Sequence, residues 1–324
     1  AVGEGVWNGW KAQLLRDLYG ATAAVLADGG ALGDSGGESE AHARLTEKAA
    51  LARETLRARQ ARIDPGFADQ WADDLDDSYW LAFRAEDRMR HAAFARAALA
   101  SGRTSAAAVR IDRRRAATEV MVLAPDRDRL FADIAAALAE LGANVMGAHV
   151  ATTRSGRAFD VFYVQDASGK PFGQSRPRAR DALLERVRRA AAGQKVRPPA
   201  QKAGLMRRRS VAFDVKPSVV FDDDAAQNAT VIEATGRDRP GLLAALAHGL
   251  AESGLSLQAA QIDGYGERVV DVFYVLKNAG KLVDETEREA VCERLLAVLS
   301  EEEDAWAEQA RSRGLARAQA SAGR

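Results

Sequence analysis

The sequence predicts an α+β protein, in which a helical N-terminal region precedes two copies of one β-α-β-β unit. Three observations support this prediction. The chain contains an internal repeat, each copy passes from strand-like to helix-like spacing and back, and the first third is rich in helix-forming residues. A repeat of this length indicates one supersecondary unit that the chain uses twice.

The two copies are Thr118–Val164 and Thr230–Val275. Asp126 aligns with Asp238 at an offset of 112, and the offset falls to 111 beyond the second glycine-containing turn. The two copies therefore differ by one residue in a hairpin.

Each copy shows the same order of local signals. An apolar run such as residues 120–123 is typical of a buried strand. Leucines and isoleucines then recur at helical spacing, and Gly142 and Gly254 supply the residue that ends a helix. Gly156 and Gly266 separate two further strand patterns, as a hairpin requires. Each copy therefore predicts a strand, a helix and a two-stranded hairpin.

The turns before the two helices carry Asp126 and Asp238, which we predict to be the helix N-caps. A carboxylate accepts hydrogen bonds from free backbone amides and suits the positive end of a helix. Pro240 fits the first helical turn, where its missing N–H is not needed.

Outside the repeats, composition predicts mainly helix. Residues 38–62 and 85–100 favour helices, and Pro65 breaks the first of them. Between the copies, residues 178–192 predict a basic helix, and Val211–Phe221 is predicted to give the last strand of the first unit. A helix is predicted over residues 285–299, and no strand pattern follows it, so the second unit either lacks its own last strand or borrows one.

Composition excludes several classes. Lys plus Arg equals Asp plus Glu at 46 each, so net charge favours neither nucleic acid nor membrane. The single cysteine, Cys292, excludes an internal disulfide and fits a reducing cytosol. No apolar stretch approaches the ~20 residues that cross a bilayer, and no signal peptide is evident. We expect a cytoplasmic protein.

No catalytic constellation is evident. The four histidines lie far apart in the sequence, and none has a neighbouring aspartate. His149, in a predicted strand, is expected to be an ordinary packed residue. The arginine runs at 113–115 and 207–209 are predicted to be solvated linker rather than phosphate sites. We expect this chain to be catalytically inactive alone, without a metal.

The second copy, with Asp-Arg-Pro-Gly-Leu-Leu before its helix, resembles the ACT domain, a ferredoxin-like βαββαβ module that binds amino acids in regulated enzymes. The resemblance implies tandem ACT-like domains, with ligands held between the strand-to-helix turn of one domain and the second strand of its partner. Free amides at a helix N-terminus suit an α-carboxylate. The implied ligand-binding residues are Asp238, Arg239, Pro240, Gly241, Leu242, Ser256 and Gln261 in the second unit, and Asp126, Arg127, Asp128, Arg129, Leu130 and Asn144 in the first. The first copy has Asp128 and Arg129 where the second has Pro240 and Gly241.

A second resemblance concerns the order of segments. The Trp-containing N-terminus (VGEGVWNGWKAQLLRDLY) and residues 208–243 resemble bacterial bifunctional uridylyltransferase/uridylyl-removing enzymes. This implies an upstream phosphohydrolase tail (1–27), a helical connector (28–115), a first ACT-like domain (116–222, with a linker at 193–206), a second (228–303) and a charged tail (304–324).

That resemblance implies an amino-acid-sensing regulatory region, with glutamine favoured, in an enzyme that modifies the nitrogen-regulatory PII protein. The family's catalytic domains would need Mg²⁺, whereas this chain is expected to hold no cofactor. Two alternatives are an ACT scaffold that pairs domains without binding a ligand, and the ACT end of another nucleotide-handling enzyme. ACT–ACT pairing is possible within or between chains.

Overall fold

The computed structural model describes residues 37–194, 215–226, 229–239, 241–265, 268–278 and 280–300. The helical region comprises α2 (Gly37–Gln60), α3 (Pro65–Asp74), α4 (Asp77–Ala82) and α5 (Ala85–Ala100). Asp64 caps α3 by accepting from the Phe67 amide at 3.0 Å, and Pro65 occupies its first turn. The predicted helices at 38–62 and 85–100, and the break at Pro65, are confirmed. The predictions for residues 1–27, for 195–206 of the linker, for 207–209 and for 304–324 lie outside the described residues.

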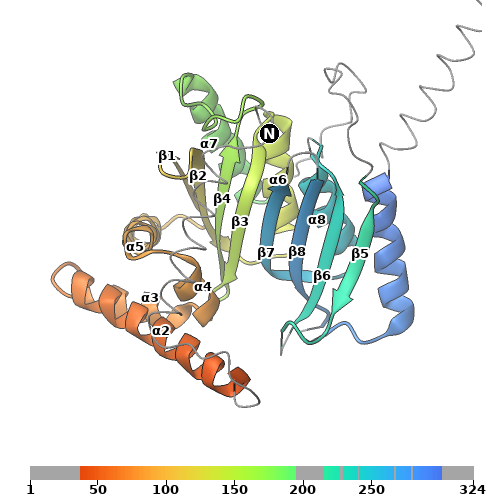
Figure 1. Ribbon diagram of the computed structural model, residues 1–324. Coiled ribbons are helices and arrows are strands. Elements are labelled where there is room, and N and C mark those ends of the chain that lie inside the picture. Colours follow the sequence, from red (N-terminus) through yellow and green to blue (C-terminus); the bar gives the residue numbers. More distant parts are fainter. Residues whose placement is uncertain are drawn as a thin grey trace, which may run out of the picture.

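The first unit forms one antiparallel sheet in the order β1-β2-β4-β3 (Figure 1). Its elements are β1 (Ala106–Asp112), β2 (Ala117–Pro125), α6 (Leu130–Glu140), β3 (Asn144–Thr152), β4 (Arg157–Gln165) and α7 (Pro177–Ala191). The second unit repeats this plan in the order β5-β6-β8-β7. Its elements are β5 (Ser218–Asp222), β6 (Thr230–Arg237), α8 (Leu242–Glu252), β7 (Ser256–Tyr265), β8 (Arg268–Leu276) and helical residues 285–300. The predicted α+β class with tandem ACT-like units is confirmed.

The fourth strand of each sheet comes from the segment before the repeat, not after it. The prediction that Val211–Phe221 ends the first unit is wrong, because Ser218–Asp222 pairs with β6 of the second unit. Likewise, residues 106–112 form strand β1 instead of helix. Strand β1 is joined to β2, and β5 to β6, by a short connection. A short connection favours antiparallel pairing of neighbouring strands. The exact domain limits stay predictions.

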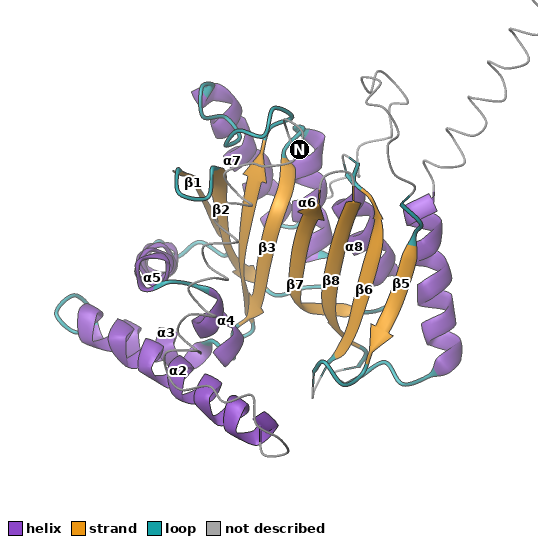
Figure 2. Ribbon diagram, viewed as in Figure 1, coloured by secondary structure: helices purple, strands orange, loops and turns teal. Residues whose placement is uncertain are grey.

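Helices cover the first sheet on both faces (Figure 2). Alternate β2 residues divide between two cores: Val120 and Val122 pack towards α6 and α7, whereas Met121 and Leu123 pack towards the helical region. Because both faces are buried, residues 120–124 of β2 are apolar without alternation. Trp71, Tyr79 and Phe83 dominate the second core, and the Trp71 and Phe159 rings meet edge to face at 5.2 Å.

The two units lie side by side. Strand β3 runs along β7, and α6 packs against α8 (Figure 1). One apolar core extends through both units and includes Leu138, Leu246 and Phe273. Strands β3 and β7, which follow α6 and α8, therefore meet where the two units join. Among the described residues, no helix has both the length and the apolar composition needed to span a membrane.

Candidate ligand-binding turns

The first turn does not use its aspartate as a helix cap. The N-cap of α6 is Arg129, with φ of 66°, and it makes no side-chain cap hydrogen bond. Asp126 instead accepts a hydrogen bond from the Thr152 hydroxyl at 2.9 Å, which ties the turn to the end of β3. The predicted N-cap role of Asp126 is wrong because the helix starts after a left-handed residue three positions later.

The second turn has the same backbone form. Gly241, with φ of 83°, is the N-cap of α8 and stands at the position of Arg129. Asp238 is therefore not the N-cap that the sequence predicted. Pro240 lies outside the described residues. A left-handed residue favours glycine, because a Cβ crowds the following carbonyl in this conformation.

The arginine of each turn supports the second helix of its own unit. Arg127 donates to the carbonyl of Ala190 in α7 at 2.9 Å and pairs with Asp133 at 2.8 Å. Arg239 donates to the carbonyl of Val298 at 2.7 Å in the same way. These contacts satisfy carbonyls near the helix ends, where cations are favourable. The repeated arginine thus has a structural partner in both units.

The remaining predicted site residues divide into buried and exposed groups. Leu130 and Leu242 are buried beneath the turns and belong to the core. Asn144 and Ser256 are exposed at the starts of β3 and β7, and Gln261 is exposed further along β7. Asp128 is exposed in the first turn. The polar candidates therefore lie on β3, on β7 and on the first turn, and their role in binding stays a prediction.

No pattern in the sequence pointed to His248. This residue lies in α8, is 8% exposed, and its Nδ1 is 2.7 Å from Nη2 of Arg129 across the two units. Burial and the nearby Arg129 guanidinium lower the pKa of His248, so the ring is neutral at pH 7. With Nδ1 accepting from Arg129, Nε2 carries the ring proton. A repeat alignment could not find this contact, because the matching residue in the first unit is Ala136.

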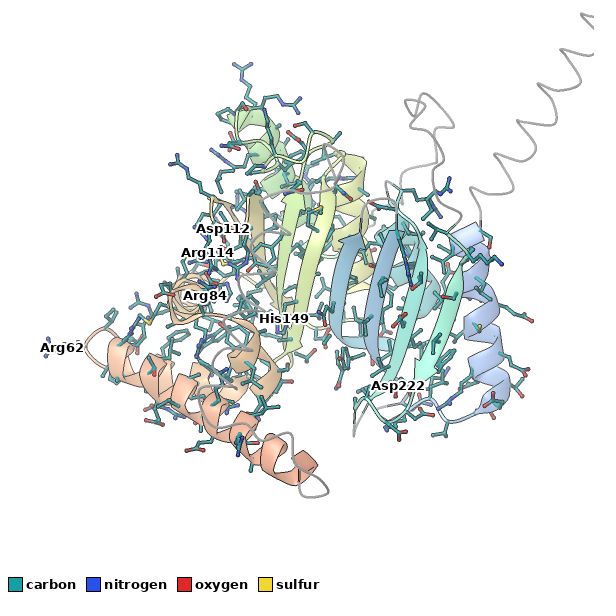
Figure 3. The ribbon with its side chains drawn as sticks, in the orientation of Figure 1. Arg62, Arg84, Asp112, Arg114, His149 and Asp222 are labelled. Carbon is teal, nitrogen blue, oxygen red and sulfur yellow. The ribbon has the colours of Figure 1, made fainter. Side chains whose placement is uncertain are left out.

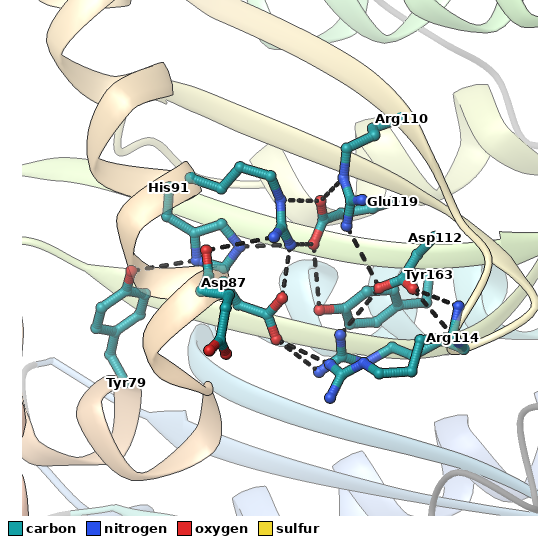
Figure 4. A network of polar contacts seen from close by, with 11 residues as sticks. Tyr79, Asp87, His91, Arg110, Asp112, Arg114, Glu119 and Tyr163 are labelled. Atoms are coloured by element: carbon teal, nitrogen blue, oxygen red, sulfur yellow. Dashed lines mark hydrogen bonds and ion pairs between the residues drawn. The ribbon is translucent and has the colours of Figure 1, made fainter.

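A second polar cluster lies between α5 and the first sheet. Asp87, Asp112 and Glu119 are buried, and their carboxylates are close enough together to suggest a metal site. Figure 4 shows how arginines surround them, and Figure 3 places Asp112 and Arg114 beside α5.

Each of these carboxylates contacts at least two guanidinium groups. Arg115 bridges Asp87 and Asp112 at 3.0 Å each, and Arg90 reaches Glu119 at 3.0 Å. Arg114 and Arg110 add further contacts to this cluster. A divalent cation would have to displace these guanidinium groups. The arrangement therefore favours a structural ion-pair network, called the clamp below, over a metal site. The prediction that the 113–115 run is solvated linker is wrong for Arg114 and Arg115.

Hydrogen bonding keeps the clamp charged. Burial alone would raise the pKa of Glu119, but His91, whose Nε2 lies 3.6 Å from the carboxylate, and two hydrogen bonds from Arg90 outweigh it and hold that pKa below its ordinary range. Nδ1 of His91 forms a hydrogen bond with the Tyr79 hydroxyl, at 3.1 Å. The network therefore extends from the aromatic core of the helical region to β2.

Comparisons with known proteins show what the chain is similar to. The ACT domain family model matches residues 118–171. The chain is 48% identical to the bifunctional uridylyltransferase/uridylyl-removing enzyme of Phenylobacterium zucineum (strain HLK1), covering 100% of this chain and 33% of that protein. It is 46% identical to the enzyme of the same name from Caulobacter vibrioides (strain NA1000 / CB15N), with the same coverages. The Azospirillum brasilense protein of that name is 36% identical, over 93% of this chain and 31% of its own length. Among solved structures, an aspartate kinase from Synechocystis gives a TM-score of 0.33 at 18% identity, covering 57% of this chain and 28% of that one.

The fold and the family match define an ACT-domain protein. The chain spans about a third of the length of the curated relatives it matches. It belongs to the family of bifunctional uridylyltransferase/uridylyl-removing enzymes and corresponds to their C-terminal part.

Proposed function

We propose that this chain is the amino-acid-sensing region of a uridylyltransferase/uridylyl-removing enzyme, and that it binds glutamine at an inter-unit turn. The observation that carries this proposal is the pairing of the two units. It sets β3 beside β7 and α6 beside α8, and these strands carry the exposed polar residues Asn144 and Ser256. Free amides at the helix N-termini suit the α-carboxylate of an amino acid.

A sensor must also transmit its ligand state. An amino acid that contacts a turn of one unit and a strand of the other binds one arrangement of the units better than another, and this difference in affinity is the only source of a switch. We propose that the switch acts on catalytic domains elsewhere in the parent enzyme, which would use Mg²⁺ and modify the PII protein in the cytoplasm. The chain itself is proposed to be inactive alone.

Isothermal titration of the 324-residue chain with L-glutamine tests this proposal, with L-glutamate and L-serine as comparators. We expect the chain to bind glutamine selectively. In Gly241→Val the affinity for glutamine should weaken at least tenfold, because the valine side chain would crowd the approach to the α8 amides. Asp238→Ala is the companion variant at the same turn. Circular dichroism spectra that match the unaltered chain are the control for folding.

The second candidate function is a pairing scaffold without a ligand. Its support is the shared core, since α6 packs on α8 and the apolar cluster extends through both units. The absence of heat with all three amino acids, at protein concentrations that detect a Kd of ~1 mM, would favour the scaffold and reject the sensor.

A further inference from the structure

The hairpin between β3 and β4 is fastened to the helical region. It meets the last residue of α3, Asp74, through three hydrogen bonds. The Arg154 amide donates to the Asp74 carbonyl at 2.9 Å, and the Ser155 amide and hydroxyl donate to the Asp74 carboxylate at 2.8 Å and 2.6 Å. A carbonyl in the last turn of a helix has no partner within that helix, so the Arg154 amide satisfies it.

The same hairpin also holds the first strand-to-helix turn. The Asp126 amide donates to the Gly156 carbonyl at 3.0 Å, and the Thr152 hydroxyl donates to the Asp126 carboxylate at 2.9 Å. Inside the hairpin, the Thr153 amide donates to the Arg157 carbonyl at 2.7 Å, and the Gly156 amide donates to the Thr153 carbonyl at 2.9 Å. The hairpin is therefore a small hydrogen-bonded unit that joins α3 to the turn.

The two attachments of the helical region to the first sheet differ in burial. Glu119, at the centre of the clamp, is fully buried, whereas Asp74 is half-buried and Ser155 and Asp126 are exposed. Hydrogen bonds that water can replace open at low cost, but a buried network of charges does not. The attachment at Asp74 can thus open locally while the clamp stays closed.

The polar groups of this attachment are features of the first copy. The hairpin of the second copy is one residue shorter, and Gly264 stands at the position of Thr152. Glycine has no hydroxyl, so this position of the second copy cannot supply the contact that Thr152 makes with Asp126.

We propose that residues 152–156 form a latch that couples the first strand-to-helix turn to the helical region, with Asp74 as the positioning residue. A displacement of α3 acts on the hairpin and so on Asp126. An amino acid that repositions the turn acts on α3 through the same bonds, because coupling between two sites is reciprocal. This regulatory role rests on the proposed function, whereas the latch itself requires no ligand.

Amide hydrogen exchange, measured by NMR on the 324-residue chain without ligand, tests the latch. In Asp74→Ala the amide of Asp126, whose partner is Gly156, should exchange at least about fivefold faster, as expected for the loss of about one hydrogen bond. Asp74→Asn should show a smaller change, because its amide oxygen can still accept from the Ser155 amide.

The matched control is Asp73→Ala. It removes the neighbouring acid of α3, which pairs with Arg57 of α2 at 2.5 Å, and should leave the exchange of the Asp126 amide unchanged. Ser155→Ala is a milder variant that removes only the hydroxyl contact, and it should accelerate Asp126 in the same direction. The amide of Leu246 in α8 is the folding reference and should exchange equally in all chains.

Two results would overturn the latch. Faster exchange confined to the Arg154 and Ser155 amides would show that the turn is independent of α3. Equal acceleration of Asp126 in Asp73→Ala would show a general loosening of α3 instead. Titration with L-glutamine is a separate arm: the absence of binding would reject the proposed function and the regulatory role, while the exchange data would still decide the latch.

Discussion

At the scale of single residues, a buried aspartate lies in β4 of the first unit, between the apolar residues Phe159 and Val161. Asp160 on β4 is 1% exposed, and its Oδ1 has no hydrogen-bond partner among the described residues. Burial, with Asp126 adding to it, raises the pKa of Asp160 well above its ordinary value. The second copy keeps an aspartate, Asp271, at the matching position. The carboxyl group is therefore neutral in the folded chain at a pH where the unfolded chain ionises it.

The raised pKa of Asp160 predicts that Asp160→Asn stabilises the folded chain by an amount that depends on pH. A raised folded-state pKa means that the folded chain binds more protons than the unfolded chain above about pH 4, so stability falls as pH rises. Asparagine does not titrate, so the variant should gain stability relative to the unaltered chain between pH 5 and pH 8. Urea unfolding at both pH values measures the difference. An equal difference at the two pH values would show that Asp160 is not buried as a neutral acid.

At the scale of elements, α5 is held to the first sheet by charge as well as by aromatic packing. Glu119 on β2 is fully buried and contacts Arg90 of α5 and Arg110 of β1. Removing one member of a buried, paired network leaves its partners uncompensated, which costs about 3–5 kcal/mol. An exposed pair of the same type is worth at most about 1 kcal/mol.

We therefore predict that Glu119→Gln lowers the free energy of unfolding by about 3 kcal/mol. The matched control is Glu185→Gln, which breaks the exposed Glu185–Arg189 pair in α7, where the charges lie 3.0 Å apart, and should change it by less than about 0.5 kcal/mol. Urea unfolding followed by circular dichroism measures both. Equal small effects would mean that aromatic packing alone holds α5 in place.

A second contact between elements, that of β6 with the 285–300 helix, depends on the small size of Gly236. A Cβ added at Gly236 on β6 would lie 2.6 Å from Cδ2 of Leu299 in the 285–300 helix. The helix therefore packs directly on the strand backbone. We predict that Gly236→Val destabilises the chain by about 1–3 kcal/mol through overpacking.

A double-mutant cycle checks the cause of that effect. Leu299→Ala removes the side chain that the new valine would meet, so the cost of Gly236→Val should be smaller in the Leu299→Ala background. Unfolding free energies from urea titration of the four chains give the coupling. Additive effects would place the strain somewhere other than this helix.

At the scale of the whole molecule, buried histidines make the fold sensitive to acid. Burial lowers the pKa of His149 to about 4, with a small opposing effect of Asp76. Burial also lowers the pKa values of His91 and His248. An unfolded histidine titrates near pH 6.5. Because the unfolded chain binds more protons below that pH, the stability from these neutral rings is complete above about pH 6.5 and is lost as pH falls towards 4.

We predict a steady fall in the unfolding midpoint between pH 7 and pH 4, and a shallower fall in His149→Gln. Glutamine removes the titrating group while keeping a polar side chain of similar length. Thermal unfolding across this range measures the two slopes. Identical slopes for the two chains would show that His149 does not contribute. In both chains the raised pKa of Asp160 should make this fall in stability smaller.

The local pattern of the sequence determined most of the secondary structure. The repeat, the helix spacing and the glycines that end α6 and α8 are encoded within short windows, and α5 and α7 lie within a residue of their predicted limits. The sheet to which a strand belongs is not encoded within a short window. Both residues 218–222 and residues 106–112 have partners that only the register of the sheets defines.

By itself, the sequence determined that the chain uses one β-α-β-β unit twice, and it marked the turns where a ligand is expected. Only the tertiary structure decided what those turns contact. Whether Asp126 caps a helix, whether Arg114 is solvated, and whether Arg129 meets His248 depend on groups that lie far apart in the chain. The physical reason is that helix and strand periodicity are local properties, whereas burial, pKa and inter-unit contacts arise only when distant segments exclude water together.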